Sequence, residues 1–287
     1  MIKAARGKYS LIKNEEIGPG VFEINVSSPG IAEAAAAGQF VNIYLPGGEM
    51  LLPRPIGIAD VKGDTVALVF AVVGEGTRAL SRFKGGEKIE LMGPLGTGFF
   101  DYPGSTDPIP SEVLLIGGGA GVPPLNFAAR KLKLAHGNSV RLTAFLGFSK
   151  EPWYTGGLEN ACDEVWAASE TEGAAAFHGN VVGLLDSVSR RGSGQWGPGC
   201  LALACGPRPM LAAAAQWCEA RKIPLRVSME ERMGCGYGAC AGCAIDTRPF
   251  RDESRLQGGA CMPGETGIVK KKVCVDGPVF WADEVVW

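Results

Sequence analysis

The chain has 287 residues, of which 46% are apolar, and its 28 basic and 30 acidic side chains leave a net charge of −2. This length and apolar content predict a globular protein of two or three domains. No block of basic residues is available to follow a phosphate backbone, so the composition argues against a nucleic-acid partner.

Residues 1–6 lack the apolar core of a signal peptide, and no uncharged run approaches the roughly 18 residues of a membrane span. We therefore expect a cytoplasmic protein without a membrane span. Nine cysteines in such a chain point to metal or redox chemistry rather than to disulfides. Four of them lie in apolar or helical contexts and are predicted to be mostly buried, namely Cys162, Cys200, Cys205 and Cys218.

The first third of the chain alternates short β runs with turns. The runs cover residues 21–26, 39–45, 65–73 and 87–92. This pattern predicts an antiparallel barrel or sandwich.

Two stretches of this region suit an anion. Arg54 stands between two prolines that stiffen the chain, and a planar guanidinium held in this way can bind a phosphate. Residues 74–77, Gly-Glu-Gly-Thr, follow a strand and precede a predicted helix start, where backbone amides attract anions. The alternatives are a surface ion pair for Arg54 and a plain glycine-rich turn for residues 74–77.

Beyond a predicted linker at residues 103–108, strands alternate with helices. The strands are expected at residues 113–116, 140–146, 164–168, 201–205 and 225–227, and the helices near 123–135, 181–190 and 208–221. This order predicts a doubly wound parallel sheet, with a ligand crevice at the carboxyl ends of the strands.

Two turns of this sheet suit a dinucleotide. Residues 117–124, Gly-Gly-Gly-Ala-Gly-Val-Pro-Pro, lie between the first strand and its helix and loosely match the Gly-x-Gly-x-x-Gly fingerprint. Residues 205–210 follow the fourth strand, where an ordinary strand-to-helix turn is the alternative. Glu170 and Glu172 follow the third strand, where carboxylates would repel a 2′-phosphate and favour NAD over NADP. Their alternative is a solvated surface.

The C-terminal region holds the most specific motif. Cys235, Cys240 and Cys243 have the spacing Cys-x4-Cys-x2-Cys, and Cys274 follows at a distance, which is the plant-type ligand pattern of a [2Fe-2S] cluster. Interspersed glycines allow backbone amides to turn towards sulfur. Zinc is the alternative, although its cysteines usually come as two close pairs. Short β runs are expected at residues 273–275 and 278–280.

These motifs, taken in order, resemble a known family. The chain is similar to the electron-transfer subunit of type B dihydroorotate dehydrogenase, within the ferredoxin-reductase superfamily. The resemblance covers nearly the whole chain. It is carried by Arg54-Pro55-Ile56, Gly74-x-Gly76-Thr77, Gly117 to Pro124, Leu146-Gly147-Phe148, Cys205-Gly206-Pro207-Arg208-Pro209-Met210, Glu230 to Gly236 and Cys274-Val275-Asp276-Gly277-Pro278.

The resemblance implies a multidomain α+β fold. An N-terminal antiparallel barrel for FAD would span residues 1–102, a central doubly wound α/β domain for NAD(H) residues 103–227, and a small [2Fe-2S] domain residues 228–287. FAD would be held by Arg54, Pro55, Ile56, Gly57, Val69, Phe70, Ala71, Gly76 and Thr77. NAD(H) would lie over Gly117, Gly118, Gly119, Gly121, Val122, Pro123, Cys205, Gly206 and Pro207. The cluster ligands would be Cys235, Cys240, Cys243 and Cys274.

The sequence departs from the family pattern at three places. Gly57 stands where the family usually has serine, and Ala71 where arginine is common. Residues 248–269 look like an insertion that contains Cys261, a rival fourth ligand, although the Cys-x-Asp-Gly-Pro context favours Cys274.

The implied function follows from counting electrons. Nicotinamide moves two electrons as a hydride, and a [2Fe-2S] cluster accepts one, so we expect FAD between them and no catalytic acid, base or nucleophile. The resemblance implies an FMN-containing dihydroorotate dehydrogenase catalytic subunit as partner, in a heterotetramer that serves pyrimidine biosynthesis. The alternatives are a related subunit of a ferredoxin:NADP or sulfide oxidoreductase, and a zinc-stapled module without catalytic function.

Overall fold

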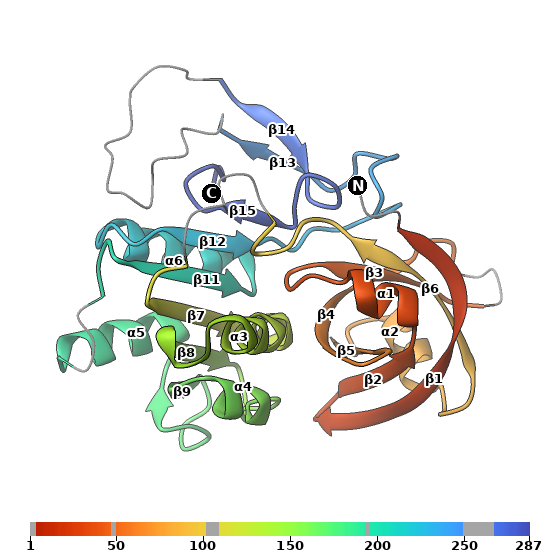
Figure 1. The fold of residues 1–287 in the computed structure, drawn as a ribbon, viewed down its shortest axis with the longest axis horizontal. Helices are drawn as coiled ribbons and strands as arrows, with labels where there is room; N and C mark the ends of the chain where they lie inside the picture. Colours follow the sequence, from red (N-terminus) through yellow and green to blue (C-terminus); the bar gives the residue numbers. More distant parts are fainter. Residues whose placement is uncertain (1–3, 47–49, 102–108, 193–195, 249–266) are drawn as a thin grey trace.

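The computed structural model describes residues 4–46, 50–101, 109–192, 196–248 and 267–287. The predicted linker at residues 103–108, Cys261 and most of the predicted insertion lie outside these ranges. A barrel stands beside a parallel sheet, and the C-terminal segment lies across the junction of the two (Figure 1). Within the parts of the chain that the structure describes, none of the helices has both the length and the apolar composition needed to cross a membrane.

The N-terminal unit is a closed antiparallel barrel with the strand order β1-β2-β5-β4-β3-β6. Its interior is filled by aliphatic side chains that are fully buried, such as Ile24, Ile43, Ile58 and Leu68. The elements are β1 (Ala5–Gly18), β2 (Val21–Ser27), α1 (Pro29–Ala34), β3 (Phe40–Tyr44), β4 (Arg54–Lys62), β5 (Thr65–Ala71), α2 (Glu75–Ser81) and β6 (Lys88–Leu95).

The predicted barrel is confirmed, but two of its strands were not expected from the sequence. The sequence of β1 lacks the alternation of apolar and polar residues that indicates a strand. Accordingly, Leu11 is its only buried residue. The strand β4 begins at Arg54 and includes Pro55, which argues against a strand because proline cannot donate to the ladder. Pro55 is tolerated here as the second residue of its strand.

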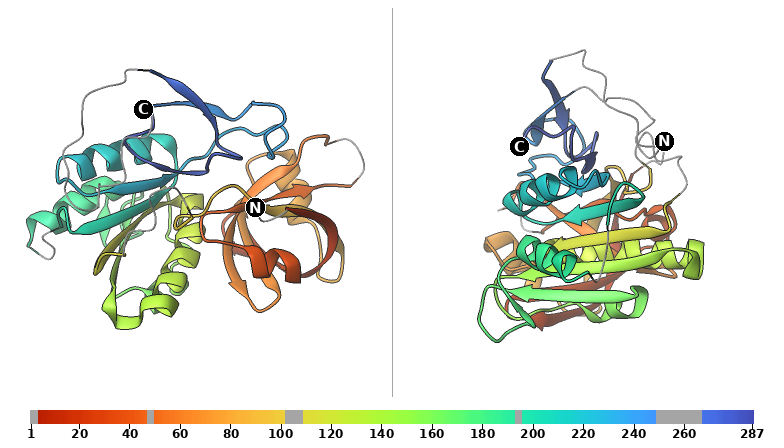
Figure 2. Two further views of the ribbon diagram at one scale, coloured as in Figure 1. Left: turned by 45° about the horizontal axis from the view of Figure 1, so that its top comes forward. Right: turned by 90° about the vertical axis from the view of Figure 1, so that its left-hand side faces the viewer.

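The central unit is a seven-stranded sheet with the order β10-β9-β8-β7-β11-β12-β15. The strands from β10 to β12 are parallel, and helices lie on both sides of the sheet (Figure 2). The elements are β7 (Glu112–Gly118), α3 (Val122–His136), β8 (Arg141–Phe148), α4 (Gly156–Ala161), β9 (Glu164–Ser169), β10 (Phe177–His178), α5 (Val181–Arg190), β11 (Cys200–Cys205), α6 (Arg208–Glu219) and β12 (Leu225–Ser228), with the 3₁₀ turns η1 (Gly119–Gly121) and η2 (Gly137–Ser139).

All five predicted parallel strands and all three predicted helices are confirmed, with ends within two residues of those expected. The chain leaves β7 towards β8 on one side and reaches β11 on the other side of β7. The order of strands therefore reverses between β7 and β11, which is where doubly wound sheets open a ligand crevice.

The C-terminal segment contributes a hairpin and one strand. The hairpin joins β13 (Ala244–Thr247) to β14 (Val269–Lys272), and β15 (Val279–Trp281) pairs antiparallel with β12. The prediction of a strand at residues 273–275 is wrong. Val275 and Asp276 donate their backbone N–H groups to the carbonyl oxygen of Lys272 and form a turn. The run at residues 278–280 does form a strand, but as the edge of the central sheet.

The contact of β15 with the central sheet is expected to stabilise the protein. Phe280 is fully buried in β15, so Phe280→Ala should lower the free energy of unfolding by about 3 to 5 kcal/mol through the cavity that it leaves. Val73→Ala is the control, since Val73 is 86% exposed. Denaturant unfolding followed by circular dichroism measures both. Equal stability of the two variants would contradict this packing.

Candidate functional site

Arg54 and Gly76, both predicted to hold FAD, meet in the structure. The guanidinium of Arg54 donates to the carbonyl oxygen of Leu52 at 2.5 Å and lies directly over the first turn of α2. A Cβ atom on Gly76 would overlap the guanidinium. A glycine at this position therefore allows the arginine to lie against the helix start.

Thr77, another predicted FAD residue, already has hydrogen-bond partners in the loop. Its hydroxyl accepts from the backbone N–H groups of Val73 and Gly74, at 3.0 and 3.2 Å, and donates to the carbonyl oxygen of Gly74. The side chain thus shapes the turn before α2 through these hydrogen bonds.

The predicted FAD residues of β5 point to both sides of the barrel wall. Phe70 stacks on Phe22, with ring centroids 5.9 Å apart. Val69 is buried against Ala59 and Ala67 on the outer face. Ala71 packs against the same cluster as Val69, so these two side chains share one face of β5 and Phe70 lies on the other.

The two predicted nucleotide turns lie side by side at the carboxyl ends of β7 and β11. Gly117 is in register with Cys205, and a Cβ on Gly121 would overlap the carbonyl group of Cys205. Gly206 adopts a φ of +155°, and a Cβ there would lie 3.1 Å from the backbone nitrogen of Gly118. Glycines therefore let the two backbones touch, and the structure brings Gly117 to Pro123 together with Cys205 to Pro207 at the reversal of strand order.

The thiol of Cys205, at the end of β11, is buried and stays protonated at neutral pH. Burial raises the pKa of Cys205 to about 12, and the carboxylate of Glu230 contributes to the same shift. Glu230 lies two residues beyond the end of β12, and desolvation raises the pKa of its carboxyl. It opens the motif Glu230 to Gly236 that carries the family resemblance, but sequence reasoning assigned it no role of its own.

The loop with the first three predicted cluster ligands directs backbone amides at sulfur. The N–H groups of Ala239 and Cys240 donate to Sγ of Cys235 at 3.2 and 3.4 Å, and the N–H of Gly242 donates to Sγ of Cys240 at 3.5 Å. Burial opposes ionisation of Cys235, but backbone hydrogen bonds from Tyr237, Cys240 and Ala239 outweigh it and lower the pKa to about 6. The loop thus favours a thiolate, the form that binds iron.

Cys243 and Cys274 form a second, buried pair. Their sulfurs are 3.3 Å apart, and each residue is 2% exposed. Burial and the neighbouring thiol raise the pKa of Cys274 to about 12, so a bound cation would favour the ionised form of this pair. Two pairs of thiols, one at Cys235 and Cys240 and one here, fit a cluster whose two irons together take four thiolates.

Asn42 holds the cluster loop against the barrel. Its Nδ2 donates to the carbonyl oxygen of Cys235 at 2.9 Å, and a Cβ on Gly236 would lie 2.5 Å from the same nitrogen. Asn42 pairs with Pro55 in the register of β3 and β4. The cluster loop is therefore one strand away from the predicted flavin residues. Sequence reasoning missed Asn42, although a polar residue within the apolar run Phe-Val-Asn-Ile was a usable signal.

Gly57 lies where the barrel touches the central sheet. A Cβ on Gly57 would be 3.0 Å from Cγ of Pro124, in the first turn of α3. This close approach gives a physical reason for glycine at a position where the family usually has serine. The flavin strand and the nucleotide loop are thus in contact.

Replacing Gly76 should displace Arg54 and weaken flavin binding. Gly76→Ala is expected to lower the affinity for FAD at least tenfold, about the loss from removing one or two charge-assisted hydrogen bonds. Gly74→Ala is the control, because no atom lies within 4 Å of its would-be Cβ and its φ of −168° is an extended conformation. Fluorescence titration of the apoprotein with FAD measures both. Similar affinities for the two variants would contradict the role of Gly76.

Serine substitutions should distinguish Cys274 from Cys261 as the fourth ligand. Cys274→Ser is expected to bleach the cluster absorption and to lower iron from about two atoms per chain towards zero. Cys261→Ser should keep both. Iron analysis with visible spectroscopy of the purified chain makes the comparison, and the opposite pattern would move the fourth ligand to Cys261.

Known proteins match this chain over nearly its full length. The iron-sulfur cluster binding domain of dihydroorotate dehydrogenase B matches residues 230–256 and 258–286. The dihydroorotate dehydrogenase B (NAD(+)) electron transfer subunit of Caldanaerobacter subterraneus is 32% identical over 280 residues, which cover 98% of each chain. The subunit of the same name from Bacillus velezensis is 34% identical over 278 residues, or 95% of each chain.

Solved structures share the fold. An NADH-dependent reduced ferredoxin-NADP oxidoreductase superposes with a TM-score of 0.77 at 27% identity, covering 97% of this chain and 90% of the other. A ferredoxin NADP+ reductase from Neisseria gonorrhoeae with bound FAD and NADP has a TM-score of 0.60 at 14% identity, covering 75% and 91%. The identity over the full length and the match over the cysteine segment show that the chain belongs to the family of dihydroorotate dehydrogenase B electron transfer subunits.

Proposed function

We propose that the chain carries electrons between NAD(H) and a catalytic subunit by way of FAD and a [2Fe-2S] cluster. The proposal rests on one observation: the cluster loop and the nucleotide helix both lie close to strand β4, which carries predicted flavin residues. The cluster loop reaches its neighbour β3 through Asn42, and the nucleotide helix reaches Gly57 through Pro124. Three separate motifs of the sequence therefore converge on one strand.

In the proposed assignment each unit holds one cofactor. The barrel of residues 1–102 holds FAD, with Arg54 as the phosphate ligand. The sheet of residues 103–227 holds NAD(H) over the two glycine turns at Gly117 and Gly206. Residues 228–287 hold the cluster through Cys235, Cys240, Cys243 and Cys274.

The side chains of this chain bind and orient, and none is required for proton transfer. FAD, when bound, links hydride transfer with one-electron transfer, and this is the step that neither nicotinamide nor an iron-sulfur cluster supplies alone. Arg54 and the amides before α2 offer positive charge to a pyrophosphate. Cys205 stays protonated at neutral pH, because burial raises the pKa of its thiol.

The proposed partner is an FMN-containing dihydroorotate dehydrogenase catalytic subunit, in a cytoplasmic heterotetramer. The relatives are named electron transfer subunits, which supports a separate catalytic subunit. Cys240 is exposed, and Tyr237 and Val275 beside the cluster loop are 51% and 48% exposed. An apolar surface around an exposed ligand supports docking of another protein at the cluster.

A related subunit of another oxidoreductase is the second candidate. The similarity to the NADH-dependent reduced ferredoxin-NADP oxidoreductase, at a TM-score of 0.77, favours this candidate over a zinc-stapled module without catalytic function. The identity of the catalytic subunit that co-purifies with the chain distinguishes the first candidate from the second. Purified protein that contains zinc and no flavin would instead support the non-catalytic module.

Anaerobic reduction tests the proposed function directly. NADH should bleach the bound flavin, and the paramagnetic signal of a reduced [2Fe-2S] cluster should follow. NADPH should act more slowly, since Glu170 and Glu172 are exposed after β9 and would repel a 2′-phosphate. Absorbance and electron paramagnetic resonance monitor the two steps. A chain that holds FAD but gives no paramagnetic iron signal even with dithionite would refute the function, and faster reduction by NADPH would refute the NAD preference.

A further inference from the structure

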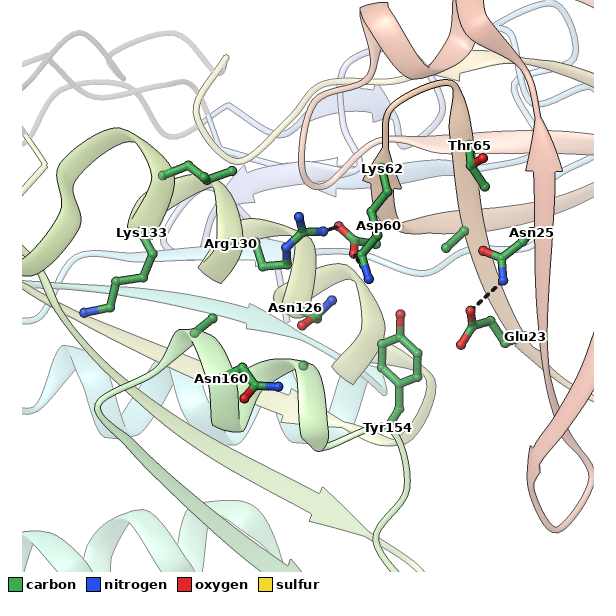
Figure 3. A pocket seen from close by; sticks show the side chains of 14 residues that line it. Glu23, Asn25, Asp60, Lys62, Thr65, Asn126, Arg130, Lys133, Tyr154 and Asn160 are labelled. Atoms are coloured by element: carbon green, nitrogen blue, oxygen red, sulfur yellow. Dashed lines mark hydrogen bonds and ion pairs between the residues drawn. The ribbon is translucent and has the colours of Figure 1, made fainter. Parts of the chain in front are cut away.

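The helix α3 lies along the barrel strand β4, and a row of contacts joins them. Pro124 touches Gly57 at the start of the row. The Nδ2 of Asn126 donates to the carbonyl oxygen of Ala59 at 3.5 Å. Further along, Arg130 forms an ion pair with Asp60, which is drawn as a dashed line in Figure 3.

The spacing of these contacts shows that the two elements run side by side in the same direction. From Pro124 to Arg130 a helix advances about 9 Å, at 1.5 Å per residue. From Gly57 to Asp60 a strand advances about 10 Å, at 3.3 Å per residue. The near equality of these lengths lets both ends of the row make contact. The ion pair is the contact farthest from Pro124 in this row, so its loss would permit the largest change in the angle between the two elements.

The ion pair is partly withdrawn from water. The side chain of Asp60 is 8% exposed and that of Arg130 is 30% exposed. Asp60 also accepts the backbone N–H of Val61 at 2.9 Å. Lys62 is 3.9 Å from Asp60, but its side chain is 76% exposed, so solvent screens its ion pair with Asp60 more than that of Arg130. Arg130 is therefore the closer and less exposed of the two cations at Asp60.

A pocket of about 540 Å³ lies beside the pair, between β2, β4 and β5 of the barrel and the helices α3 and α4 (Figure 3). Tyr154 lines it from the segment that packs Trp153 against Gly18 of the barrel. Because the pocket opens beside Asp60 and Arg130, the ion pair is the contact that joins α3 to β4 at the end of the row farthest from Pro124.

We propose that Arg130 and Asp60 are a positioning pair that sets the angle between α3 and β4. The nucleotide loop precedes α3 and the predicted flavin residues begin β4, so this angle sets how nicotinamide and flavin approach each other. Hydride transfer requires reacting atoms about 3 to 3.5 Å apart, and a displacement of about 1 Å can cost a hundredfold in rate. The inference rests on the proposed function, since it concerns the transfer between NADH and FAD.

Stopped-flow reduction of the full chain, loaded with FAD and cluster, tests the pair. Arg130→Met should lower the limiting rate of flavin bleaching by NADH about tenfold or more per bound FAD. The NADH concentration for half the limiting rate should change less than twofold, because the residues predicted to bind the nucleotide are unaltered. Arg130→Lys, which keeps the charge, should recover part of the rate. A residue that only stabilises the fold would leave the limiting rate per FAD unchanged.

Lys133→Met is the matched control. Lys133 lines the same pocket one turn along α3, but it bonds to Asp163 and to the carbonyl oxygen of Val140, both within the central unit. The limiting rate of flavin bleaching in Lys133→Met should stay within twofold of the wild-type rate. The double variant Asp60→Asn with Arg130→Met leaves no lone buried carboxylate, so it should fold even if the single variant does not, and it should be as slow.

The outcomes separate this inference from the proposed function. Wild-type flavin that NADH reduces, together with an unchanged limiting rate in the double variant, would overturn the positioning role and leave the proposed function intact. Wild-type flavin that NADH does not reduce would overturn both. Slow reduction in the Arg130 variants, with Lys133→Met as fast as the wild type, would support the pair.

Discussion

The hydrogen bond from Asn42 to the carbonyl group of Cys235 ties the two ends of the sequence together. Asn42 is fully buried in β3, and its amide donates the hydrogen bond that holds the cluster loop. A buried amide that loses its partner costs about 1 to 3 kcal/mol, so this contact holds the loop in one position. Neighbouring strands lie about 4.8 Å apart, and the loop therefore stands a single strand away from Pro55. The proposed electron transfer between flavin and cluster depends on that adjacency.

Glycine serves the same purpose at each of the three predicted sites. Gly76 lets Arg54 lie on a helix start, Gly121 lets one turn touch Cys205, and Gly236 lets the cluster loop touch Asn42. In each case a Cβ atom would come within 2.5 Å or less of its neighbour. Close contact between two segments thus explains a glycine at each site, and Gly236 also has a positive φ of +73° that favours glycine.

The sequence predicted the elements that have a strong period or a specific spacing. The parallel strands are apolar and flanked by turns, so all were found. The cysteine spacing singled out Cys243 and Cys274, whose sulfurs lie 3.3 Å apart, and Cys235 and Cys240, whose backbone N–H groups each donate to the other's sulfur. The strand β1 was missed because most of its residues are at least partly exposed. The strand β4 was missed because proline near its start argues against a strand. Neither Asn42 nor the pair of Asp60 and Arg130 was predicted. Asn42 gave a usable signal as a polar residue in an apolar run, whereas the role of Asp60 and Arg130 depends on which residues the fold brings beside them.

The strand β15 makes the nucleotide-binding unit depend on residues that follow the cluster ligands. Residues 279–281 pair with β12, so the central sheet acquires its edge only after the cysteine loop and Cys274 have been synthesised. Domains commonly fold in order as they leave the ribosome, and here the second unit remains unfinished until the third has emerged. The cluster ligands and the last strand of the sheet therefore become available at nearly the same time during synthesis. A nascent chain stalled before residue 279 would leave the edge of β12 unpaired, and an unpaired edge strand is prone to aggregation.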